Sequence, residues 1–482
     1  MIRRQFLRFA HLAIARRTSG SSSQQQLWTR AMGLQTPKTN SKAPMVFLPC
    51  DRLIEEENVP GYCAERFLQV HPGDVLGGKY EVLAKLGFGQ SSTVWLAKER
   101  TLKFWQKPTY AAVKVTTVEE NSQRRGSEVE VSRRFLQHAQ DPGYGVLRPA
   151  IDHFEVLGKN GRKHLCLVHE PLQEPMTIFR QRLLGKRVPW PLVRGYLVLL
   201  LRALDLLHTK CHVIHSDLKP ANLLMCFEKS SILAEYVRSQ ADDTMPRKVV
   251  GDRTIYESRG YIGNVESFVP LKLVDYDQAV FADGEALLRH PIQPPAYRAP
   301  EILLGIPYSY STDIWNLGLL IVYLLEGKDI FNKVLNEDGS YSARRHIASM
   351  VHLLGPPPMS LLEQEMIWRD VPLEIRSMTF DGDSITSLTT ICQFFDGPFF
   401  NEDGKHRNDN KSLDCYLRAL LYPRSEEQIT NSTLSDHITA LDGEEKGAFL
   451  DLLSQMLHWV PEKRKTAREL LDHPWLAGYR EL

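Results

Sequence analysis

The chain has 482 residues, of which 43% are hydrophobic and 24% are charged, values typical of a globular protein. Its length exceeds that of an average domain and suits a two-lobed unit. Its apolar runs fall far short of the roughly 18 residues needed to cross a bilayer. The seven cysteines are scattered, without a Cys-x-x-Cys pair. These features argue against a membrane protein, a zinc site and a disulfide framework.

Positive charge is concentrated at the start of the chain. Residues 1–50 contain eight Lys or Arg and no acidic residue, whereas the remainder carries 51 basic and 58 acidic residues, a net charge of −7. An Arg-rich, Ser-rich, acid-free start is typical of a mitochondrial presequence, but a basic disordered tail accounts for it as well. Residues 51–79 are expected to form an arm that leads into the main domain.

Hydrophobic periodicity predicts a strand-rich half followed by a helix-rich half. The predicted elements are strand–turn–strand over 79–94, strands over 110–115 and 165–170, and helices over 126–138 and 191–208. Two stretches, about 223–270 and 330–445, are long for loops in a compact domain. We expect both to be insertions and neither to be a separate domain.

The stretch from His215 to Asn222 contains an acid, a base and an amide at spacings that phosphoryl transfer uses. Asp217 is predicted to accept the proton of an attacking hydroxyl, Lys219 to stabilise the transferring phosphate, and Asn222 to bind Mg²⁺. A turn-capping role for Asp217 would leave Lys219 and Asn222 unexplained.

A glycine-rich turn upstream is predicted to hold the phosphates of ATP. Its residues are Leu86, Gly87, Phe88, Gly89, Gln90, Ser91, Ser92, Thr93 and Val94. Gly87 and Gly89 let the backbone approach phosphates that any Cβ would obstruct. Ser92 stands where a third glycine is usual. This signal is weak alone, because glycine turns are common, and its weight comes from its position before Lys114.

Lys114 is predicted to bind the α- and β-phosphates, with Val94 capping the adenine. It needs an acidic partner to hold its rotamer, and Glu128 is favoured over Glu130, which would turn two arginines toward the core. The other residues predicted to line the ATP pocket are Ala112, Glu170 and Leu172.

Downstream, Asp275 follows a buried strand and is predicted to be the second metal ligand beside Asn222. Three further residues are predicted to support the scaffold. Asp313, on a core helix, should brace the backbone of the loop that carries Asp217. Glu301, in Ala-Pro-Glu, should pair with the buried, distant Arg464.

These motifs appear in the order of the eukaryotic protein kinases, which the chain resembles from Lys79 to Leu476. Within them it is similar to the SR-protein-specific kinases, especially their fungal branch. This closer resemblance is carried by Ser92 to Ala97, His164 to Val168, Asp252 to Tyr256, and Gln293-Pro294 before Tyr297-Arg298. Leu354 to Pro358 is similar to the wider group that contains the cyclin-dependent and MAP kinases.

The resemblance implies a bilobal α+β fold with a kinase domain over 80–476, its N-lobe over 80–170 and its C-lobe over 171–476. It implies ATP- and Mg²⁺-dependent phosphorylation of serine or threonine, in that family often within Arg/Ser-rich splicing factors. We expect a monomer that acts on protein substrates, binds neither nucleic acid nor membranes directly, and resides in the cytoplasm or nucleus. Mitochondrial import remains the alternative. The alternative functions are a catalytically dead scaffold and a small-molecule kinase.

Several positions depart from the usual kinase pattern. Asp275-Tyr276-Asp277 replaces Asp-Phe-Gly, so that a second carboxylate lies near the metal site. Ser216 replaces an arginine that normally reads a phosphate on the activation loop, and no serine or threonine lies between Asp275 and Glu301. We therefore expect activity without an activating phosphorylation. His169 is predicted to make the pocket behind the adenine polar and sensitive to pH between 6 and 7, with a buried neutral histidine as the alternative.

Overall fold

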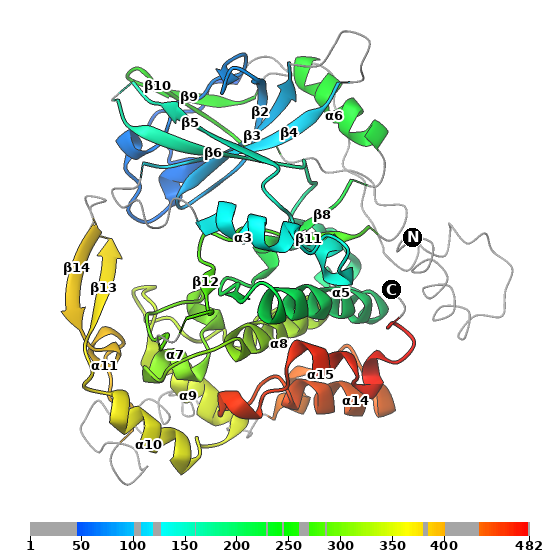
Figure 1. Ribbon diagram of the computed structural model, residues 1–482, viewed down its shortest axis with the longest axis vertical. Coiled ribbons are helices and arrows are strands. Elements are labelled where there is room, and N and C mark those ends of the chain that lie inside the picture. The colour runs from blue at the N-terminus through cyan, green and yellow to red at the C-terminus, as the bar shows by residue number, and fades with distance from the viewer. Residues whose placement is uncertain are drawn as a thin grey trace, which may run out of the picture.

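The computed structural model describes residues 46–100, 108–118, 127–159, 161–227, 230–242, 245–259, 269–284, 287–378, 384–400 and 433–480. Residues 1–45 of the predicted tail and 401–432 of the second insertion lie outside these ranges. A lobe built around a sheet lies above a helical lobe (Figure 1). This arrangement confirms the predicted bilobal α+β fold.

Six antiparallel strands form the sheet of the upper lobe, in the order β1-β2-β3-β4-β6-β5. They are β1 (Val75–Leu76), β2 (Tyr80–Gly89), β3 (Ser92–Glu99), β4 (Tyr110–Thr116), β5 (Asp152–Leu157) and β6 (Lys163–His169). The central strand β4 is buried along most of its length. Its side chains alternate between the two faces of the sheet: Val113 and Val115 join an apolar cluster on the outer face, while Lys114 points toward helix α3 (Ser127–Leu136).

The outer face of this sheet is covered by two segments that are far apart in the sequence. One is the arm before β1, and the other is part of the first insertion, which forms α6 (Ser230–Asp242) and the hairpin of β9 (Arg247–Val250) and β10 (Arg253–Tyr256). Figure 1 shows β9 and β10 beside the sheet of the upper lobe. Met245 and Tyr256 from the insertion pack with Val82 and Trp95 of the sheet. The insertion therefore belongs to the core of the N-lobe.

Buried ion pairs join the arm to this layer. Lys85 of β2 is 1% exposed and donates to the carboxylate of Glu56 and to the backbone oxygen of Tyr256. Lys248 of β9 is 2% exposed and lies 2.8 Å from Glu57. Arm, insertion and sheet are thus held together by charges that are removed from water.

The lower lobe is built around two long helices, α5 (Trp190–Thr209) and α8 (Ser311–Glu326), which are buried along most of their length. Helix α5 confirms the helix predicted over 191–208. In the described ranges, the other helices of this lobe are α4 (Met176–Gln181), α7 (Pro300–Leu304), α9 (Ala343–Leu354), α10 (Met359–Trp368), α11 (Ile391–Phe394), α13 (Leu434–His437), α14 (Gly443–Ser454) and α15 (Ala467–Leu471). Among the helices of the described ranges, none is both long and apolar enough to cross a membrane.

Short strand pairs position the loops between the lobes. Strand β7 (Val213–Ile214) pairs with β12 (Val280–Phe281), and β8 (Leu223–Met225) pairs with β11 (Leu271–Leu273). The loop that contains Asp217 runs from β7 to β8, so both of its ends are fixed. A separate hairpin of β13 (Leu373–Met378) and β14 (Ser384–Thr389) lies within the second insertion.

Candidate active site

The three residues predicted to act at the transferring phosphate lie together in the loop between β7 and β8. The carboxylate of Asp217 accepts hydrogen bonds from Lys219 Nζ at 2.8 and 3.0 Å and from Asn222 Nδ2 at 2.8 Å. Asn222 Nδ2 also donates to the backbone oxygen of Asp217 at 2.9 Å. Because both bonds use the amide nitrogen of Asn222, its amide oxygen remains as the atom that can bind a cation.

Asp313 of α8 holds the backbone of this loop through two hydrogen bonds. Its carboxylate accepts from the backbone N–H of His215 at 2.8 Å and from that of Ser216 at 2.9 Å. Ser216 adopts a φ of +64°, a left-handed conformation that is unfavourable for residues other than glycine. The prediction that Asp313 braces this loop is confirmed.

Asp275 lies beside Asn222 because the strands that precede and follow them are paired. Strand β11 pairs with β8, and the N–H of Val274 donates to the backbone oxygen of Asn222 at 3.0 Å. Asp275 itself has a φ of +69°. The next residue, Tyr276, is fully buried, with its ring 5.5 Å from that of Phe135 in α3. Tyr276 therefore fills an apolar slot against α3.

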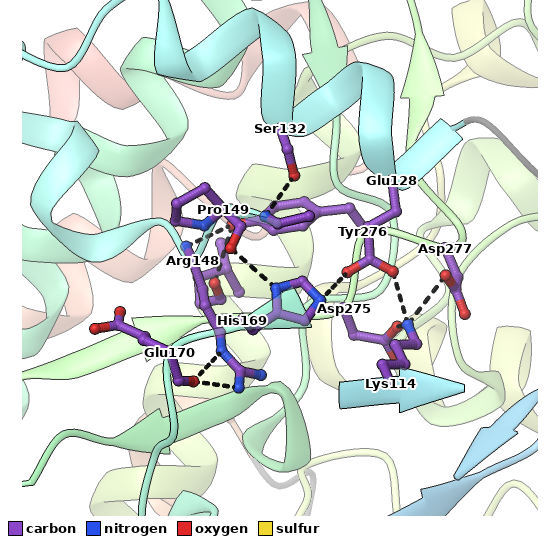
Figure 2. A network of polar contacts seen from close by, with 12 residues as sticks. Lys114, Glu128, Ser132, Arg148, Pro149, His169, Glu170, Asp275, Tyr276 and Asp277 are labelled. Carbon is purple, nitrogen blue, oxygen red and sulfur yellow. Dashed lines mark hydrogen bonds and ion pairs between the residues drawn. The ribbon is translucent and has the colours of Figure 1, made fainter. Parts of the chain in front are cut away.

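Lys114 lies at the centre of three carboxylates, as Figure 2 shows. Its Nζ is 2.8 Å from Glu128, 2.8 Å from Asp275 and 3.0 Å from Asp277. Oxygens of these three acids lie within 4.8 Å of one another. Burial alone would lower the pKa of Lys114, but Asp275, Asp277 and Glu128 raise it well above its usual value. The lysine is therefore charged and fully paired.

The choice of Glu128 as the partner of Lys114 is confirmed. Glu128 is 5% exposed, and it is held on the face of α3 that carries the buried Val131 and Phe135. Glu130 points elsewhere and binds Arg133 at 2.7 Å and Arg134 at 3.2 Å. The helical period of α3 thus separates the two acids into a site residue and a surface residue.

A family model described as "Protein kinase domain" matches residues 80–476. The chain belongs to the protein kinase family. It is 31% identical over 448 residues to a serine/threonine protein kinase of Aspergillus fumigatus, which covers 91% of this chain and 95% of that protein. It is 26% identical over 451 residues to the serine/threonine-protein kinase SRPK of Physarum polycephalum, with 88% and 92% covered. With the kinase AFC1 of Arabidopsis thaliana it shares 24% over 415 residues, with 85% and 73% covered. The protein is a serine/threonine kinase similar to SRPK.

The two glycines of the predicted phosphate-binding turn have free space where a side chain would begin. A Cβ added at Gly87 would meet nothing within 4 Å, and one at Gly89 would make only an ordinary contact at 3.5 Å with the hydroxyl of Ser92. The protein itself therefore does not demand glycine at either position. We therefore predict that glycine is needed at positions 87 and 89 to make room for a bound phosphate.

The other residues predicted to line the ATP pocket lie on two strands of the upper sheet and in the segment that follows β6. Val94 of β3 is the register partner of both Gly87 and Lys114, and Ala112 of β4 is paired with His169 of β6. Glu170 and Leu172 follow directly after β6, where the chain passes from one lobe to the other. Leu172 is 7% exposed, whereas Glu170 is exposed.

The expectation that His169 titrates between pH 6 and 7 is wrong. This side chain is 3% exposed, and its Nδ1 donates to the backbone oxygen of Pro149 at 3.0 Å. Burial, together with the positive charges of Arg148 and Lys114, lowers the pKa of His169 well below 6.5. The alternative of a buried neutral histidine therefore holds. No pattern in the sequence places these two cations near His169.

Arg148 is a residue of the kinase site that the sequence analysis missed. It is 9% exposed, and its guanidinium donates to the backbone oxygen of Glu170 at 3.1 and 2.5 Å (Figure 2). Burial lowers its pKa to about 10, so Arg148 stays charged at neutral pH. Through these bonds Arg148 fixes the backbone of the segment that follows β6. An isolated arginine between two loops carries no periodic signal that could have revealed this role.

The kinase's activation segment, which follows Asp275, is held by packing and hydrogen bonds. Ser216 donates its hydroxyl to the backbone oxygen of Gln278, so the residue that replaces the phosphate-reading arginine itself contacts this segment. Arg134 of α3 lies 2.8 Å from Asp283. Arg289 donates to the backbone oxygens of Gly305 at 3.1 Å and Trp368 at 2.9 Å. Carboxylate and carbonyl acceptors thus anchor the segment.

The predicted ion pair between Glu301 and Arg464 is confirmed. Two bonds of 2.6 Å join the guanidinium to the carboxylate, and both side chains are completely buried. Such bidentate pairs fix geometry as well as charge. Together with Asp313, this pair supports the kinase's active site without touching it.

Proposed function

We propose that this kinase transfers the γ-phosphoryl group of ATP, with Mg²⁺, to serine or threonine in basic or Arg/Ser-rich proteins. The observation that carries the proposal is that Lys219 and Asn222 both donate to the carboxylate of Asp217. The strand that follows this loop is paired with the strand that leads to Asp275, which contacts Lys114. A catalytic base, two cations and two oxygen ligands for a metal are the groups that phosphoryl transfer requires.

Each of these residues has a chemical role in the proposal. Asp217 accepts the proton of the substrate hydroxyl as the oxygen attacks phosphorus. Lys219 has three donors, and about a third of its side chain is exposed, so it can bond to the phosphoryl group as well as to Asp217. Lys114 binds the phosphates of ATP from the other side of the cleft.

The residues present fit the nucleotide and the metal. The amide oxygen of Asn222 and the carboxylate of Asp275 are hard oxygen ligands of the kind Mg²⁺ prefers, and the glycine turn leaves room for phosphates. When bound, Mg²⁺ would neutralise negative charge on the phosphates. Asn222 and Asp275 would hold it through loops fixed by the pairing of β8 with β11.

The proposed substrate class rests on the resemblance to SR-protein-specific kinases and on the similarity to the Physarum SRPK. The net charge of −7 outside residues 1–50 also favours basic partners. We expect a peptide of Arg-Ser repeats to be phosphorylated with a higher kcat/KM than a generic basic protein such as a histone. Equal kcat/KM values for the two substrates would contradict this specificity.

Asp217→Asn tests the mechanism. This change keeps the volume of the side chain but removes the base, so we expect the rate to fall by a factor of at least about 10². The affinity for ATP, measured by calorimetry, should change by less than about twofold. Lys114→Met is the matched comparison, because it should weaken ATP binding as well as the rate. Undiminished turnover by Asp217→Asn would refute the role of this residue.

A further inference from the structure

All hydrogen-bond donors of Lys114 are used by carboxylates in this structure. A lysine ammonium has three donors, and its three acceptors here are Glu128, Asp275 and Asp277, at 2.8, 2.8 and 3.0 Å (Figure 2). A phosphate can therefore bind Lys114 only by taking the place of one of these carboxylates. Glu128 and Asp275 belong to the conventional kinase pattern. The third acid stands where Asp-Phe-Gly has a glycine with no side chain.

Asp277 also holds the tip of the glycine-rich turn. While one carboxylate oxygen lies 3.0 Å from Lys114 Nζ, the other accepts a hydrogen bond of 3.1 Å from the hydroxyl of Ser91. Ser91 lies in the turn between β2 and β3, and its backbone oxygen is anchored by the N–H of Thr117 at 2.8 Å. Asp277 thus bridges Lys114 and the turn, the two groups that are predicted to bind the phosphates.

We propose that Asp277 is a gate for the nucleotide: it occupies Lys114 and Ser91 in the resting enzyme and must be displaced by the phosphates of ATP. This inference rests on the proposed function, because it takes Lys114 as a phosphate ligand. Asp277 opposes nucleotide binding in two ways. It competes for the ammonium of Lys114, and its negative charge repels the incoming phosphates. The kinase therefore binds ATP more weakly than it would with an uncharged residue at this position.

Nucleotide binding to the full-length protein, measured by calorimetry with and without Mg²⁺, tests the gate. Asp277→Asn removes the charge but keeps an acceptor for Ser91, and we expect it to lower the Kd for ATP and ADP about tenfold. Tenfold corresponds to about 1.4 kcal/mol, the size of one hydrogen bond to a charged group. Adenosine is the control ligand: it has no phosphates, so its Kd should stay within about twofold.

A double-mutant cycle separates the gate from a general change in the pocket. Ser91→Ala should tighten ATP binding about threefold in the wild type. In an Asp277→Gly background, where the hydroxyl of Ser91 has lost this acceptor, the same change should tighten ATP binding by less than it does in the wild type. Unchanged or weaker ATP binding by both Asp277 variants would overturn the gate, and so would an equal change for adenosine. If the wild type and every variant bound no nucleotide, the proposed function would fall, and the gate with it.

Discussion

Removing the carboxylate of Glu56 should destabilise the kinase although this residue lies far outside the catalytic loop. Lys85 is 1% exposed, and in the Glu56→Ala variant it would lose its closest acceptor. Its remaining acceptors would be Glu55, at 3.5 Å in the wild type, and the carbonyl of Tyr256, at 3.0 Å. Breaking a buried pair by removing one partner costs about 3–5 kcal/mol. Because Glu55 compensates in part, we expect the lower end, about 3 kcal/mol.

The expected change in melting temperature follows from the size of the domain. The unfolding entropy is about 2.1 cal/mol/K per residue, and the kinase domain spans residues 80–476. A loss of about 3 kcal/mol therefore lowers Tm by about 4 °C. Differential scanning calorimetry of the purified full-length protein measures this shift directly.

An exposed ion pair in the same lobe is the matched control. Glu155 and Lys163 lie 2.7 Å apart, with side chains 47% and 57% exposed. Such pairs contribute about 0.2–1 kcal/mol, so Glu155→Ala should lower Tm by about 1 °C or less. Replacing both partners of the buried pair, as in Glu56→Leu with Lys85→Met, should restore most of the loss. Equal shifts for Glu56→Ala and Glu155→Ala would refute the reasoning.

Arg134→Ala removes the ion pair between α3 and Asp283, so kcat should fall about five- to tenfold. Phosphatase treatment of the wild type should leave kcat unchanged. An unchanged kcat in Arg134→Ala together with a lower kcat after phosphatase treatment would show control by phosphorylation. Burial raises the pKa of Glu174 from 4.5 to about 7 despite its bond to Arg182. Its folded form thus binds a proton more tightly than the unfolded form, so stability should fall as the pH rises from about 4.5 to 7, by at most about 3 kcal/mol. The decrease in Tm between pH 5 and 8 should accordingly be smaller in Glu174→Gln, and equal decreases would contradict this. For His169, whose pKa lies well below 6.5, ATP affinity should be constant between pH 6 and 7. A pH dependence that disappears in His169→Phe would show that it titrates there.

Much of the catalytic unit could be predicted from local patterns. The helical period in α3 was enough to choose Glu128 over Glu130, because one face of a helix must be apolar to pack. The spacing of Asp217, Lys219 and Asn222 brought these residues together in one short loop. Even the distant pair of Glu301 and Arg464 could be predicted, since each stands in a motif of the family that the chain resembles.

The tertiary structure alone revealed the contacts between segments that carry no motif. Nothing in the sequence around Glu56 indicates that it meets Lys85, or that the first insertion completes the core of the N-lobe through Tyr256. The same holds for Asp277: it was expected near the metal site, and an oxygen of its carboxylate does lie within 4.8 Å of one of Asp275, but no pattern indicated that it also bridges Lys114 and Ser91. Local periodicity reports which face of an element is buried. The identity of the partner depends on how distant segments pack, and charges become paired there because burial makes an unpaired charge costly.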